Sequence, residues 1–217
     1  MVMAALRLAR FLKNSIESPT ARRITVFAVG ISLGGAIVYA GLALFQMNAD
    51  SRTDAGELLS TKPSLPVAIR VPAVGISADF ETPLDLQSNG LMEVPKGYDT
   101  VAWYKHSPTP GEQGPSVVVG HVDSEEGPEV FQPLKDLKDG DLIEVERRDG
   151  SVAVFEVYRV SYHSKKRFPF EKVFGDVDGS EIRLITCGGL FDKNSMSYSH
   201  NLVAYGRFLH WKEKGTN

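Results

Sequence analysis

The chain has 217 residues, 42% of them hydrophobic and 24% charged, with a net charge of −3. This length and composition predict one globular domain, two at most, and exclude collagenous and wholly disordered chains. The chain has 24 Lys and Arg residues and 27 Asp and Glu residues, so it lacks the basic excess of a general nucleic-acid binder. We therefore expect no nucleic-acid partner. A single cysteine, Cys187, excludes an internal disulfide and a cysteine-based zinc cluster within one chain.

Residues 24–47 form an uncharged apolar run, ITVFAVGISLGGAIVYAGLALFQM. About 20 apolar residues cross the hydrocarbon core of a bilayer, so this run predicts one transmembrane helix; a cleaved signal peptide would have a shorter apolar region. The segment 1–23 carries five basic residues against Glu17 alone. By the positive-inside rule we expect this basic segment in the cytoplasm and the remaining chain outside the cell, anchored in the cell membrane by a single pass.

Residues 48–66 are polar and predict a linker. From residue 67 the pattern changes to short β-rich runs, separated by Gly, Pro and Asp, at a spacing typical of a sandwich or a barrel. These runs are VAIRV, SVVVG, LIEVE, VAVFEVYRV, IRLIT and LVAYGRF. We therefore expect a mostly β domain over 67–210 and a polar tail that begins near His210 and covers 211–217.

Two local patterns are specific within this domain. The pair Asp149-Gly150 predicts the tight turn of a β-hairpin, with Ile143 and Val145 before it on one face of the first strand. Three apolar residues recur at helical spacing before Gly140 and predict one short helix. They are Phe131, Leu134 and Leu137.

Cys187 and His121 are candidates for nucleophilic catalysis. A cysteine nucleophile needs a group that takes its proton or keeps it as thiolate, and histidine is the usual partner. His121 follows the strand SVVVG, and Cys187 ends the strand IRLIT, so the two strand ends can converge at one rim of a barrel. A small buried cysteine and an unrelated histidine remain the alternative. His106 and His163 are expected in loops.

At these residues the sequence resembles the sortases, most closely those of class F. Leu184-Ile185-Thr186-Cys187 is similar to the L-x-T-C signature, and Gly120-His121-Val122-Asp123 is similar to the segment around the catalytic histidine. The strings GPSVVVGHVDS, EIRLITCGGLFD and YSHNLVAYGRF resemble class F, and RVPAVGISA resembles the first barrel strand. The likeness extends from about Ile69 to Leu209.

The resemblance implies an eight-stranded sortase-type β-barrel with short helices, preceded by the N-terminal transmembrane helix. Its cysteine attacks the threonine carbonyl of an LPxTG-like sorting signal on secreted proteins, and an amine resolves the thioester. That amine belongs to a peptidoglycan precursor of the cell wall or to a pilin, with wall anchoring of surface proteins as the default for class F. On this basis Cys187 is the nucleophile, His121 is the proton donor and acceptor, and no metal or organic cofactor is needed.

One departure from the family pattern concerns an arginine in the strand after the cysteine. Residues 190–206 contain none. Alignment of LVAY with the family's last strand places Asn201 there, where its amide could donate a hydrogen bond to an oxyanion without charge assistance. His200, Lys193 and Arg183 are the alternatives. Arg183 lies four residues before Cys187, on the same strand face, but an ordinary strand-surface arginine is the favoured interpretation.

Two other classes compete with a sortase. An L,D-transpeptidase of the cell wall also uses Cys and His, but it usually carries a Ser/His-x-Gly-Cys motif, which Thr186-Cys187-Gly188-Gly189 does not match. A catalytically degenerate, sortase-like binding module is supported only by the missing arginine. The presence of both Cys187 and His121 argues against this module.

Overall fold

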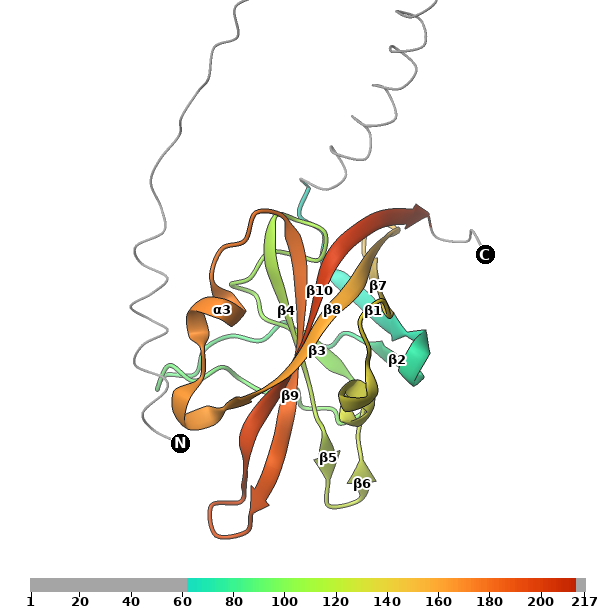
Figure 1. The fold of residues 1–217 in the computed structure, drawn as a ribbon. Helices are drawn as coiled ribbons and strands as arrows, with labels where there is room; N and C mark the ends of the chain where they lie inside the picture. The colour runs from blue at the N-terminus through green and yellow to red at the C-terminus, as the bar shows by residue number, and fades with distance from the viewer. Residues whose placement is uncertain (1–61, 214–217) are drawn as a thin grey trace, which may run out of the picture.

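The computed structural model describes residues 62–213 (Figure 1), and these residues are mostly β. In chain order the elements are β1 Pro66–Val71, η1 Pro72–Val74, β2 Ile76–Asp79, β3 Val101–Trp103, β4 Gly114–Gly120, β5 Asp123–Ser124, β6 Gly127–Pro128, η2 Gln132–Asp136, β7 Leu142–Arg147, β8 Ser151–Ser164, η3 Lys165–Arg167, α3 Phe170–Phe174, β9 Ser180–Asp192 and β10 Ser197–Glu213. The predicted basic segment, the predicted transmembrane helix and most of the linker lie outside the described residues. Within 62–213, no helix has the length and apolar character needed to span a bilayer.

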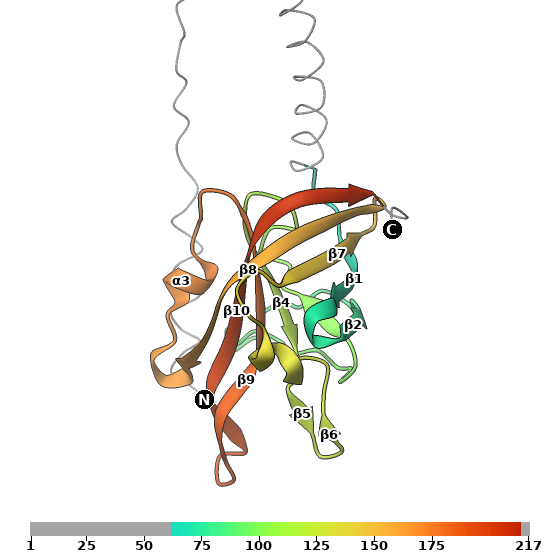
Figure 2. The ribbon, with the colours of Figure 1, turned by 45° about the vertical axis from the view of Figure 1, so that its right-hand side comes forward.

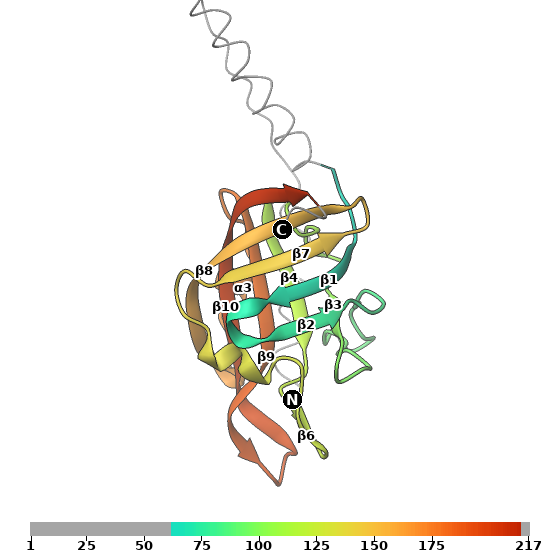
Figure 3. The same cartoon turned by 90° about the vertical axis from the view of Figure 1, so that its right-hand side faces the viewer.

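Eight strands form one sheet in the order β2-β1-β7-β8-β10-β9-β4-β3. The pairing of β4 with β9 is parallel, and the other pairings in this sheet are antiparallel. The two edge strands meet where Phe80, directly after β2, forms a parallel bridge with Val101, and the amide of Glu81 donates to the Val101 carbonyl at 2.9 Å. The sheet therefore curls into a nearly closed barrel (Figure 3), which confirms the expected mostly β barrel.

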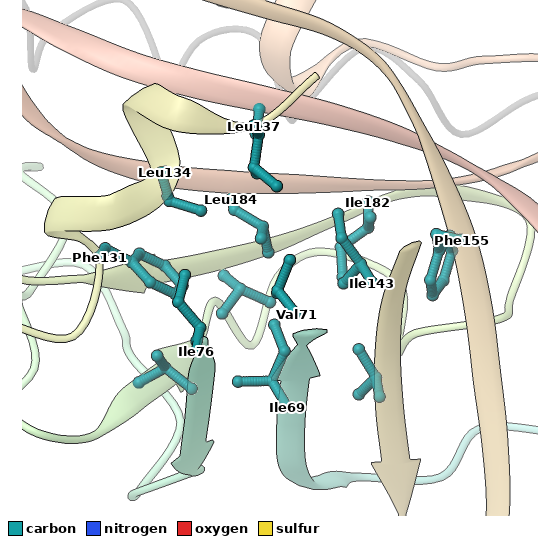
Figure 4. Packing of buried hydrophobic residues seen from close by; sticks show 14 of the residues in the cluster. Ile69, Val71, Ile76, Phe131, Leu134, Leu137, Ile143, Phe155, Ile182 and Leu184 are labelled. Carbon is teal, nitrogen blue, oxygen red and sulfur yellow. The ribbon is translucent and has the colours of Figure 1, made fainter. Parts of the chain in front are cut away.

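The barrel interior is filled by apolar side chains that alternate along the strands (Figure 4). Ile182 and Leu184 of β9 point into this core, while Arg183 and Ile185 face the opposite side, as the period of two of a β-strand requires. A second, smaller cluster covers the outer face of the sheet. It contains Tyr104, Val117, Val173, Ile185, Val203 and Tyr205, with Val173 supplied by α3.

The two local predictions inside the domain are confirmed. β7 and β8 form an antiparallel hairpin in which Ile143 is opposite Phe155 and Val145 is opposite Ala153, and Gly150 in the turn has φ of +86°. The predicted short helix is η2, a 3-10 helix. Leu134 within η2 and the two residues that flank it, Phe131 and Leu137, are all buried in the barrel core.

Three expected boundaries differ from the structure. β9 does not end at Cys187 but continues to Asp192 and forms a hairpin with β10. β10 runs through His210 to Glu213, because β8 pairs with it from His200 to Glu213, so His210 is opposite Val154 and does not begin a tail. For the same reason His163 lies in β8, opposite Asn201, and not in a loop.

Candidate active site

The parallel pairing of β4 with β9 brings the segments that carry His121 and Cys187 side by side. In this pairing Val119 is opposite Ile185, and the Thr186 hydroxyl donates to the Gly120 carbonyl at 2.8 Å. His121 and Cys187 directly follow Gly120 and Thr186, so the two segments run side by side. β4 ends at Gly120, whereas β9 continues past Cys187 to Asp192, so only His121 lies at a strand end.

Both residues belong to the outer face of the sheet. A Cβ atom on Gly120 would lie 2.7 Å from the Phe131 ring, which is part of the barrel core, so position 120 faces inward and His121 faces outward. Leu184 of β9 points into the same core, which places Cys187, three residues later, on the outer side. The two side chains therefore share one face.

The imidazole of His121 is held by the segment between β2 and β3. Its Nε2 donates to the Pro95 carbonyl at 2.8 Å, and the Tyr98 ring lies 4.8 Å away between centroids. Because a carbonyl only accepts, Nε2 carries the hydrogen, and in the neutral ring Nδ1 keeps the lone pair. The nitrogen available for proton transfer is therefore Nδ1.

Cys187 is a partly buried free thiol whose sulfur has a cation beside it. The Nζ atom of Lys165 lies 3.5 Å from Sγ and 3.2 Å from the Ser197 hydroxyl oxygen. Sequence reasoning missed Lys165, since it belongs to a run of three basic residues, KKR, that resembles an ordinary solvated segment. Only the pairing of β8 with β10 and of β10 with β9 brings this lysine to the cysteine.

Asn201 lies directly opposite Cys187 on β10, and His163 lies opposite Asn201 on β8. Opposite residues of an antiparallel pair have Cβ atoms about 4.5 to 5.5 Å apart and point to the same face. Asn201 is half-buried. Asn201 thus lies on the strand next to Cys187, and its role as the donor at the family's arginine position stays a prediction.

Two of the three alternative oxyanion donors, Arg183 and His200, contact other side chains, and the third, Lys193, is exposed. Arg183 is 2% exposed, forms an ion pair with Glu181 at 2.5 Å and stacks 4.7 Å from the centre of the Tyr205 ring. The expectation of a strand-surface arginine is wrong, because the outer face is covered here by the smaller apolar cluster. Lys193 is exposed in the turn between β9 and β10, and His200 Nδ1 lies 2.8 Å from the Ser199 hydroxyl.

A cavity of about 480 Å³ adjoins Cys187 at this end of the barrel. Its lining comprises Val122, Asp123, Ser124, Gly127, Pro128, Gln132, Lys135, Tyr162, Cys187, Gly188, Gly189, Tyr198 and Leu202. The β5–β6 hairpin and the tip of the β9–β10 hairpin project side by side here (Figures 1 and 2). The hydroxyl of Tyr198 donates to the Asp123 carboxylate and links the two hairpins.

This link has an electrostatic consequence. The pKa of Tyr198 is raised to about 12, first by its hydrogen bond to Asp123, then by burial and by the negative charges of Asp123 and Cys187. Tyr198 therefore remains a neutral hydrogen-bond donor at physiological pH. Among residues 62–213, no group of three or more His, Cys, Asp and Glu is arranged to hold a metal ion.

The chain belongs to the sortase family: the family model described as the sortase domain matches residues 69–209. It is thus an enzyme of the cysteine transpeptidase class. No curated protein matches the sequence.

Solved structures of sortases share the fold. Sortase A of Listeria monocytogenes is 19% identical with a TM-score of 0.50, covering 72% of this chain and 93% of that chain. A lid mutant of sortase A from Corynebacterium diphtheriae is 18% identical, with a TM-score of 0.51 and coverage of 69% and 72%. Sortase C-1 of Actinomyces oris is 20% identical, with a TM-score of 0.52 and coverage of 68% and 73%. These neighbours are of classes A and C, so class F stays a prediction.

The surroundings of His163, which lies opposite Asn201, predict how the stability of the fold depends on pH. Its Nε2 lies 2.8 Å from the Tyr205 hydroxyl, and its pKa is lowered from 6.5 by burial and by the charges of Lys172 and Arg159. Below pH 6.5 the unfolded chain takes up a proton that the folded chain resists, so the folded state loses stability as the pH falls.

We expect the free energy of unfolding to decrease more steeply between about pH 7 and pH 5 in the wild type than in His163→Gln. Urea unfolding of the full-length chain, followed by tryptophan fluorescence, measures both slopes. Equal slopes would show that His163 titrates alike in the folded and unfolded states.

Proposed function

We propose that this sortase cleaves an LPxTG-like sorting signal on secreted proteins and transfers them to an amine of the cell wall. The observation that supports the proposal is the parallel β4–β9 pairing of a sortase barrel, in which the bonded pair Gly120 and Thr186 directly precedes His121 and Cys187. A thiol that attacks a carbonyl needs an adjacent proton donor for the leaving amine, and this arrangement supplies both groups.

In the proposed reaction the Cys187 sulfur, as thiolate, bonds to the threonine carbonyl carbon, and the carbonyl electrons move to its oxygen. The carbon–nitrogen bond then breaks, and His121 gives its Nδ1 proton to the leaving amine. An incoming amine then bonds to the thioester carbon and gives a proton to the same His121 nitrogen. The carbonyl re-forms, the carbon–sulfur bond breaks, and Cys187 is released as thiolate. The Pro95 carbonyl keeps Nε2 occupied, which fixes the ring so that one nitrogen serves both steps.

Asn201 is the proposed hydrogen-bond donor to the oxyanion. Its place opposite Cys187 supports this role, because an amide on the same face of the neighbouring strand can reach an oxygen bonded next to the sulfur. The donation is neutral, so Asn201 alone supplies no charge to the oxyanion.

The accepting amine is proposed from the class F resemblance, which favours a peptidoglycan precursor over a pilin. The sortase family match disfavours the L,D-transpeptidase alternative. A catalytically degenerate binding module is the remaining alternative, and the assay below distinguishes it by the absence of turnover.

The proposed chemistry predicts the outcome of two substitutions. Cys187→Ala should abolish hydrolysis and transfer of a sorting-signal peptide while the barrel stays folded, because the nucleophile is removed with little volume. His121→Ala should lower turnover by roughly 10²-fold or more through loss of acid–base catalysis. Mass spectrometry of the full-length chain with peptide measures the acyl-enzyme. A covalent adduct on Cys187→Ala, or near-wild-type rates for His121→Ala, would contradict these assignments.

Asn201→Ala should lower kcat by about 10² to 10³, the usual effect of removing one oxyanion-hole donor. Matched controls are Lys193→Ala, His200→Ala and Arg183→Ala, each checked for folding by circular dichroism. We expect only small losses in Lys193→Ala and His200→Ala, since Lys193 is exposed in the turn between β9 and β10 and the His200 imidazole is paired with the Ser199 hydroxyl. A larger loss in any control than in Asn201→Ala would refute the role of Asn201.

We also propose that the catalytic domain lies outside the cell, anchored by a transmembrane helix over 24–47. The proposal rests on the apolar run and on the five basic residues that precede it. Protease added to intact, wall-stripped cells should degrade the epitope of a C-terminal tag. Full protection of the tag with an intact membrane would reverse this topology.

A further inference from the structure

The sulfur of Cys187 is contacted by a cation that comes from a different element of the fold. Lys165 Nζ lies 3.5 Å from Sγ, and its second polar contact is the Ser197 hydroxyl at 3.2 Å. Lys165 is half-buried, whereas its neighbours Lys166 and Arg167 are exposed. The contact therefore distinguishes one lysine from the rest of the basic run.

The order of the strands places the Lys165 side chain close to Cys187. Ser164 ends β8 opposite His200, and Lys165 follows as the first residue of η3. His200 is in turn opposite Gly188, which places β8, β10 and β9 at one level next to Cys187. β10 lies between β8 and β9, so these two strands are separated by two spacings of about 4.8 Å each. The long, flexible stem of Lys165, together with the 3.5 Å contact to the sulfur, bridges this gap across β10.

Hydrogen bonds around Ser197 orient the ammonium group. The Ser197 hydroxyl donates to the Tyr198 carbonyl at 3.4 Å, which leaves its oxygen lone pairs free to accept from Lys165. None of the ion pairs found within residues 62–213 uses Lys165, so no carboxylate neutralises the charge there. The charge of Lys165 is thus available to the sulfur.

We propose that Lys165 is the cationic catalytic residue of this enzyme, and that it stabilises both the Cys187 thiolate and the oxyanion formed on attack. When the sulfur bonds to a carbonyl carbon, the negative charge moves from sulfur to the carbonyl oxygen, only two bonds away. An ammonium beside the sulfur is close to the charge before and after this step, and it keeps its own proton throughout. Lys165 adds the charge that the neutral amide of Asn201 lacks; the oxyanion part of this proposal rests on the proposed function.

The test uses the charge of an alkylating reagent as the probe. Because Cys187 is the only cysteine, iodoacetamide and iodoacetate both report on this sulfur alone. Both rate constants depend equally on the fraction of Cys187 that is thiolate, so this fraction drops out of their ratio. The ratio of iodoacetate to iodoacetamide then reports how strongly a nearby cation attracts the anionic iodoacetate. A merely structural lysine would not change this ratio.

In the full-length chain we expect Lys165→Met to lower the iodoacetate-to-iodoacetamide ratio by about 3- to 5-fold, the size expected of a unit charge some 4 Å away in bulk water. Lys165→Arg should keep the wild-type ratio, and Lys166→Met, the matched control, should not change it. Salt should lower the wild-type ratio and leave that of Lys165→Met unchanged. Lys165→Gln, also neutral, replaces Lys165→Met if the methionine disturbs folding.

Turnover of a sorting-signal peptide completes the experiment. Lys165→Met should lower kcat by about 10²-fold, and Lys165→Arg should restore most of it. An unchanged alkylation ratio in both neutral variants, or an equal decrease in Lys166→Met, would overturn the proposal. If the wild type cleaves no such peptide, the proposed substrate is wrong, while the alkylation ratio still tests whether Lys165 acts on the sulfur.

Discussion

The site depends on one interaction, the parallel pairing of β4 with β9. Parallel neighbours need a long connection, and here the chain between them forms η2, the β7–β8 hairpin, η3 and α3. Because both strands run in the same direction and are paired up to Val119 and Ile185, the segments that carry His121 and Cys187 follow side by side. The bond from Thr186 to the Gly120 carbonyl is buried and fixes this register directly before the two reactive residues. A slip of one residue would turn one side chain into the core, because successive residues of a strand face opposite sides.

The alternation along these strands also explains which residues can stand next to the reactive pair. Gly120 faces the core, where a Cβ would lie 2.7 Å from Phe131, so glycine lets η2 close the barrel against β4. Thr186 faces the same interior and is 3% exposed, so its hydroxyl needs a partner within the protein, which is the Gly120 carbonyl. The core thus holds the rigid support, and the outer face is left for His121, Cys187 and Asn201.

The sequence predicted the barrel, the β7–β8 hairpin and the short helix, because each of them follows from a local pattern of residues. The sequence did not predict the features that depend on pairing between segments far apart in the chain. The length of β10 follows from its partner β8, so His163 and His210 were misplaced. Arg183 was expected on the surface, yet it is buried under an outer apolar cluster whose members come from five different elements or loops. No local signal separates Lys165 from Lys166.

The contribution of Lys165 changes how the parts of the fold depend on one another. An arginine on β10 would move with the strand that pairs with the nucleophile, and its geometry would be set by that single ladder. A lysine from η3 reaches the sulfur from the segment between β8 and α3, so its distance to Sγ depends on how that segment packs. Phe168, Phe170 and Phe174 in this segment contact one another, and Phe168 packs edge-on against His163. This aromatic packing, remote from the reacting atoms, therefore helps to determine the electrostatics of Cys187.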